Sequence, residues 1–176
     1  SLFATVVERL GDAKGEAWLK GVVDNMARAP KGGDTDQIKA VASGECGVAL
    51  TNTYYLARMI KSTKPEDRAT VERIKVVFPN QGTTGTHINI AGAAVAKHAK
   101  NRENAVAFME YLASPFAQDY FANGNNEFAA ANGVKIANPA LKAMGGDKFK
   151  AEQIPLGVVA KNLTKVQQML DRVGFK

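Results

Sequence analysis

Hydrophobic residues recur at helical spacing along much of the chain. In the first ten residues, Leu2, Phe3, Val6, Val7 and Leu10 lie three or four positions apart, which is the spacing of one helix face. Short segments rich in glycine, proline and asparagine separate this pattern from its later occurrences and mark turns between elements. The pattern predicts helices over residues 1–10, 15–27, 36–43, 54–61, 65–73, 101–112, 114–122 and 162–173.

Three apolar segments lack this spacing and predict strands. Residues 48–50 and 74–78 are short apolar runs, and residues 86–97 form a longer extended run of small and β-branched side chains. The small residues of the third run indicate close packing against neighbouring backbone. Helices separated by strands predict an α/β fold.

Composition and charge narrow the class of protein. Of the 176 residues, 45% are hydrophobic and 23% are charged, as in an ordinary soluble globular protein. The net charge of +6 comes from scattered basic residues, whereas nucleic-acid-binding proteins concentrate such charge on one face, so we expect no nucleic acid partner. The chain opens at Ser1 inside an amphipathic pattern without an initiator methionine, which favours a piece of a longer protein.

The single cysteine excludes an intrachain disulfide. Cys46 precedes an apolar segment, which indicates a small buried residue rather than a nucleophile. A catalytic thiol would need a base within hydrogen-bonding reach, and the only histidines are His87 and His98. We therefore expect no enzyme, and keep an enzyme using Cys46 or His87 as the less favoured alternative.

Tyr54 and Tyr55 form the most informative pair of side chains. They follow the apolar segment 48–50 and the polar residues 51–53, which predicts a strand-to-helix corner, the position where open α/β sheets bind ligands. In the first turn of a helix both phenols can lean past the helix end and converge. A phenolate is a hard anionic donor suited to a highly charged cation. Packing at the edge of a core is the commoner role of such a pair, and Asn52 before it suits either a helix cap or an anion site.

Four segments resemble the ferric-iron-binding periplasmic proteins of ABC importers, which are type II periplasmic binding proteins. They are residues 32–55, ending in Asn52-Thr53-Tyr54-Tyr55, residues 85–92, which read Gly-Thr-His-Ile-Asn-Ile-Ala-Gly, residues 101–105 and residues 170–175. The resemblance implies two α/β lobes joined by crossing strands, with iron in the cleft. Residues 1–84 would begin the C-terminal lobe, residues 85–135 would form the crossing hinge strand and part of the N-terminal lobe, and residues 136–176 would return to the C-terminal lobe.

The same resemblance implies a function and a site. Tyr54 and Tyr55 would be the metal ligands for Fe³⁺, and Asn52 would help to hold a synergistic anion, carbonate or phosphate. The protein would be the periplasmic solute-binding component that delivers ferric iron to an ABC transporter permease at the inner membrane, with no catalytic role. A binding protein for another small solute (an anion, a polyamine or thiamine) is the nearest alternative. We favour it less because those related proteins lack the tyrosine pair. His87 suits a structural hydrogen bond near the hinge better than a metal ligand.

The chain departs from the family in length. Family members are nearly twice as long, and most of the first lobe with its ligands is missing from this sequence. We therefore expect weak or incomplete iron binding by this chain alone. We also expect the helices over 101–123 to expose an apolar face and to cause self-association.

Overall fold

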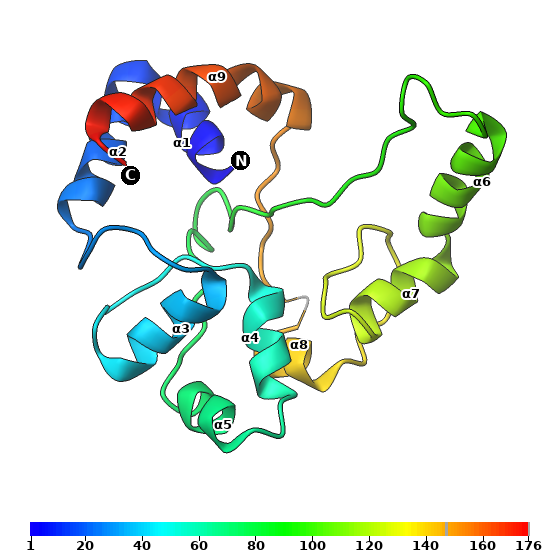
Figure 1. The fold of residues 1–176 in the computed structure, drawn as a ribbon, viewed down its shortest axis with the longest axis horizontal. Helices are drawn as coiled ribbons and strands as arrows, with labels where there is room; N and C mark the ends of the chain where they lie inside the picture. Colours follow the sequence, from blue (N-terminus) through cyan, green and yellow to red (C-terminus); the bar gives the residue numbers. More distant parts are fainter. Residues whose placement is uncertain (147, 176) are drawn as a thin grey trace. The chain divides into compact units, whose positions relative to one another are not determined.

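A computed structural model describes residues 1–146 and 148–175 (Figure 1). The described residues form nine helices connected by turns and irregular segments. They are α1 (Leu2–Leu10), α2 (Asp12–Asp24), α3 (Asp34–Ser43), α4 (Thr53–Ile60), α5 (Pro65–Val71), α6 (Arg102–Leu112), α7 (Pro115–Asn123), α8 (Pro139–Ala143) and α9 (Leu156–Val173). The chain divides into two compact units, and unit 1 consists of residues 1–36, 77–89 and 149–176, while unit 2 consists of residues 37–76 and 90–148.

The core of unit 1 lies among α1, α2 and α9, which pack together in Figure 1. Its buried side chains come from positions at helical spacing: Ala4, Val7, Leu19, Val159, Val166 and Met169. Gly15 permits the close approach of α1 and α2, because a Cβ atom at this position would lie 2.9 Å from Val7 Cγ2. The Arg172 guanidinium also joins α9 to α2 by donating two hydrogen bonds to the Glu16 carboxylate, at 2.9 and 2.7 Å.

The core of unit 2 centres on α4, which packs against α5 and α8. It contains the buried residues Ile38, Leu56, Ala57, Met59, Ala140, Leu141 and Met144. Beside this core, the buried amide of Asn138 donates to the Asn126 side chain at 2.9 Å and to the Ala122 carbonyl at 3.1 Å. These bonds satisfy polar groups that would be costly to bury alone, and they fasten the 122–126 turn to the start of α8.

Several helix ends lie where local signals predict them. Ser114 caps α7, since its Oγ accepts a hydrogen bond from the Ala117 N–H, and Pro115 is the first helical residue. Pro65 likewise opens α5. Gly174 ends α9 in the left-handed conformation, with φ 76° and ψ 29°, which glycine adopts without steric cost.

The predicted strands are not formed as strands among the described residues. The only ladder contact there is an isolated parallel bridge between Thr86 and Ala151. Residues 48–50 and 74–78 run without a hydrogen-bonded neighbouring strand among the described residues. The apolar run 48–50 is not buried, since Val48 is 83% exposed and Leu50 is 64% exposed. A strand needs a partner for its backbone groups, and within residues 1–146 and 148–175 neither segment forms a β-bridge to one.

Three further expectations are corrected. Helix α9 begins at Leu156, six residues before the predicted start, and α2 begins at Asp12 rather than at Gly15. Cys46 is half-buried rather than buried. The lobe assignment of residues 1–84, 85–135 and 136–176 stays a prediction.

Candidate functional site

The tyrosine pair lies where the sequence predicted it, at the first turn of a helix. Asn52 is the N-cap of α4 with an extended ψ of 139°, and Tyr54 and Tyr55 are the second and third residues of the helix. Leu56, Ala57 and Met59 point into the core of unit 2 and hold the helix in place. The rest of α4 therefore anchors the turn that carries the two phenols.

The rings of Tyr54 and Tyr55 lie side by side. Their centroids are 4.4 Å apart and their planes are inclined by 32°. Both residues are half-buried, and Tyr55 also packs against the core of unit 2. The two rings thus form one aromatic surface that is partly covered and partly open to solvent.

Arg58 completes this cluster and was missed by the sequence analysis. Its guanidinium carbon lies 5.1 Å from the centroid of the Tyr54 ring and 5.6 Å from that of Tyr55, within the range of cation–π attraction. Arg58 follows the two tyrosines by four and three positions, which places all three side chains on one helix surface. That spacing is the signal that would have found it.

Although Asn52 occupies the N-cap position, its side chain makes no capping hydrogen bond to α4. The residue therefore does not act as a side-chain helix cap. Its backbone carbonyl accepts from the Tyr55 N–H at 3.4 Å. The residue lies one position before the helix and two before Tyr54, beside the N–H groups that a helix start leaves without intrahelical partners.

The other candidate residues are not part of this cluster. His87 belongs to unit 1, where its ring bonds to Glu152 and Ser1, so the expected structural role is confirmed. Cys46 is a free thiol, and His98 is an exposed turn residue. Among residues 1–146 and 148–175, no group of three or more His, Cys, Asp and Glu side chains is arranged to hold a metal ion.

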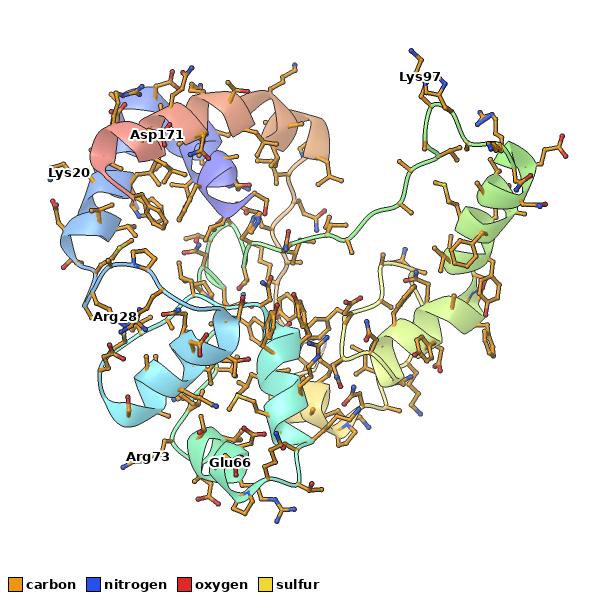
Figure 2. All side chains as sticks on the ribbon, viewed as in Figure 1. Lys20, Arg28, Glu66, Arg73, Lys97 and Asp171 are labelled. Atoms are coloured by element: carbon orange, nitrogen blue, oxygen red, sulfur yellow. The ribbon has the colours of Figure 1, made fainter. Side chains whose placement is uncertain are left out.

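A separate hollow of about 530 Å³ lies between α3 and α5 in unit 2. It is open and lined by side chains of both signs, among them Lys39, Glu66 and Arg73, the last two of which are labelled in Figure 2. Arg73 donates to the Ala42 carbonyl at 3.2 Å, near the end of α3. The hollow does not include Tyr54 or Tyr55 and has no convergent set of metal donors.

Comparison with known proteins places this chain in a family. No helix in the described part of the chain combines the length and apolar character needed to cross a membrane. Residues 4–146 match the family model described as bacterial extracellular solute-binding protein. Iron uptake protein A2 of Synechocystis is 42% identical over 178 residues, which cover 100% of this chain and 51% of that protein.

Two solved structures are similar throughout the chain. The Trichodesmium protein IdiA, or FutA, in complex with iron and citrate ligands is 46% identical with a TM-score of 0.91, over 99% of this chain and 54% of that one. The ferric binding protein from Campylobacter jejuni is 39% identical with a TM-score of 0.92, over 99% and 54%. The chain thus spans about half the length of these relatives and has the fold of the corresponding half, that of a type II periplasmic binding protein. Its relatives are solute-binding proteins for iron rather than enzymes, and the chain belongs to the bacterial extracellular solute-binding protein family.

Proposed function

We propose that this chain is the tyrosine-bearing part of a solute-binding protein for ferric iron. Tyr54 and Tyr55 bind the metal as phenolates, in a cleft between lobes of the whole protein. The observation that carries the proposal is the pairing of the two half-buried rings, with centroids 4.4 Å apart, at the first turn of an otherwise anchored helix. Two adjacent hard oxygen donors on a rigid element suit a small, highly charged cation.

Asn52 and the start of α4 would bind the synergistic anion. Unpaired N–H groups and the helix dipole favour negative charge at a helix N-terminus. Carbonate or phosphate held there would bring further oxygen donors to iron beside the phenolates. The amide of Asn52, at the N-cap of α4, would contribute one more hydrogen bond to such an anion.

The iron-binding relatives support a proposal for the role of the whole protein. The whole protein would capture ferric iron in the periplasm, close around it and dock on the permease of an ABC transporter at the inner membrane. Closure of two lobes about a ligand is a common switching motion of binding proteins. Two phenolates and an anion leave coordination positions of ferric iron open to water, so this chain alone should bind iron weakly.

Titration with ferric citrate tests the assignment. We expect wild-type protein to develop a faint phenolate-to-iron charge-transfer band that grows when bicarbonate or phosphate is added. Tyr54→Phe and Tyr55→Phe should each weaken the band, and the double variant should abolish it. Tyr120→Phe is the matched control, because Tyr120 is 63% exposed on α7 and should leave the band unchanged. Equal iron binding by the double variant and the wild type would refute the site.

A further inference from the structure

Unit 2 contains two asparagines that are each followed by glycine. Asn123 is the last residue of α7 and precedes Gly124. Asn132 precedes Gly133 in the loop of residues 130–138, which lies beside α7 (Figure 1). The same dipeptide therefore occurs in two different environments of one compact unit.

An asparagine followed by glycine can lose its side-chain amide by reaction with its own backbone. The glycine nitrogen gives up its proton to base and attacks the asparagine Cγ, and ammonia leaves as a five-membered succinimide ring closes. Water then opens the ring at either carbonyl and gives aspartate or isoaspartate. Glycine permits the attack because it has no Cβ atom and adopts many backbone conformations. The reaction thus needs a free glycine N–H and an asparagine side chain that can turn toward it.

The environment of Asn123 meets neither requirement. The Gly124 N–H donates to the Tyr120 carbonyl at 2.8 Å and is held at the end of α7. The Asn123 Nδ2 donates to Asp119 Oδ1 at 2.8 Å and to the Lys135 carbonyl at 3.2 Å. Both the attacking nitrogen and the leaving amide are therefore engaged in hydrogen bonds.

The side-chain oxygen of Asn123 also fastens one end of the loop to α7. It accepts from the backbone N–H groups of residues 137 and 138 at 2.7 and 3.0 Å. Gln118 of α7 fastens the other end, since its Oε1 accepts from the N–H groups of residues 130 and 131 at 2.8 and 3.2 Å. Asn132 and Gly133 lie between these two attachments.

The environment of Asn132 meets both requirements. Asn132 and Gly133 are exposed residues of a turn. Within residues 1–146 and 148–175, neither the Gly133 N–H nor the Asn132 side chain forms a hydrogen bond. Gly133 has a φ of 83°, and nothing lies within 4 Å of the position that a Cβ atom would take there. No contact of the folded chain opposes the approach of the Gly133 nitrogen to the side chain of Asn132.

We propose that Asn132 is a deamidation site, where the Gly133 nitrogen closes a succinimide in the folded protein, and that the hydrogen bonds at the end of α7 protect Asn123. The reaction consumes water, releases ammonia and turns a neutral side chain into a carboxylate, which lowers the net charge of +6 by one. Where isoaspartate forms, a methylene group also enters the backbone of a loop that is held at both ends. The proposal does not depend on whether the tyrosine pair binds iron.

Peptide mapping of the metal-free chain, incubated in mildly alkaline buffer, tests the proposal. Cleavage after Glu127 puts Asn123 and Asn132 on different peptides, and mass spectrometry follows the conversion of each amide to an acid. We expect Asn132 to react about tenfold faster than Asn123 or more, because the reaction at Asn123 first has to break hydrogen bonds. In guanidinium chloride, where the chain is unfolded, the two asparagines should react at similar rates. Similar rates in the folded protein would overturn the proposal, and so would an Asn132 that reacts only in guanidinium chloride.

Trapping the ring gives a second readout. Hydroxylamine cleaves the chain at a succinimide, so the folded wild-type protein should be cut between Asn132 and Gly133. Asn132→Gln is the matched control, because its side chain keeps the amide but is one methylene group too long to close a five-membered ring. This variant should stay uncut, and a wild-type chain that also stays uncut would exclude the proposed intermediate.

Discussion

The guanidinium of Arg58 lies over the ring of Tyr54, 5.1 Å from its centroid. One turn of helix separates the two residues, so the contact ties the candidate ligand to its own helix. The rotamer of the Tyr54 side chain is thereby restricted before any metal arrives. A ligand held in place in advance loses less conformational freedom on binding.

This contact predicts measurable coupling between the two side chains. In a double-mutant cycle of Arg58→Ala and Tyr54→Leu, we expect a coupling free energy of about 0.5–1 kcal/mol, the usual size of a cation–π contact at a partly exposed site. Urea unfolding followed by circular dichroism measures it. Arg73→Ala with Tyr54→Leu is the control cycle and should be additive, because Arg73 lies beyond α5 and bonds to Ala42. Additivity in both cycles would mean that Arg58 does not hold the ring.

The packing of α1 on α2 predicts opposite effects for two glycines of one helix. Gly15→Val should destabilise unit 1 by about 1–3 kcal/mol, because its side chain would enter the space of Val7. Gly21→Ala meets nothing within 4 Å and should stabilise by up to about 1 kcal/mol through helix propensity. Trp18, the only tryptophan and a residue of α2, reports the unfolding of this unit. Equal effects at the two positions would contradict the close approach.

Sequence reasoning succeeded where the determining signal is local. The start of α7 is set by Ser114 and Pro115, and the position of the tyrosines is set by the polar residues 51–53 before an amphipathic run. The start of α9 was missed because residues 156–161 include Gly157 and two valines, which are weak helix formers. These residues are helical because Val159 is buried against α1 and α2, a tertiary effect that overrides propensity.

No single segment of the sequence contains the contacts that decide strand pairing or that bring Tyr54, Tyr55 and Arg58 together. Residues 74–78 show alternating exposure, as expected for a strand, yet a ladder requires a second segment at the right register. Trp18 lies at helical spacing with apolar residues of α2, yet it is 37% exposed and packs edge-to-face against Phe3. The residue types around Tyr54 are known from the sequence. The 4.4 Å distance between the ring centroids of Tyr54 and Tyr55 depends on side-chain conformations, which only the structure gives.

The ion pair of Glu16 and Arg172 predicts a stability difference that depends on pH. The hydrogen bonds from Arg172 hold the pKa of Glu16 below its ordinary value of about 4.5. A carboxylate with a lowered pKa in the folded state stabilises the protein fully above that ordinary value, and the effect is lost as the pH falls through the lowered one.

Urea midpoints of wild type and Glu16→Gln, followed by Trp18 fluorescence, measure this effect. The variant should be less stable at pH 7, and the difference should shrink in acid and vanish once Glu16 is protonated in the folded protein. Asp24→Asn serves as a control on the same helix, since its pair with Lys20 is exposed on both sides and should contribute little at either pH. A difference that persists unchanged in acid would assign the effect of the variant to packing rather than to charge.

The aromatic surface of α6 and α7 predicts self-association of this chain. Phe108, Tyr111 and Phe116 have ring centroids about 6 Å apart in succession and are 59%, 49% and 73% exposed, and Tyr120 is 63% exposed. Soluble monomers rarely expose a contiguous apolar patch of this kind. We expect the sedimentation coefficient to rise with concentration above that of an 18.8 kDa monomer. Phe116→Ser with Tyr120→Ser should reduce this rise, because the two changes remove most of the exposed aromatic area of α7. Leu156→Ser, at an equally exposed position on α9, is the control and should leave the rise in sedimentation coefficient unchanged. A wild-type protein that stays monomeric at high concentration would show that the aromatic surface does not cause self-association.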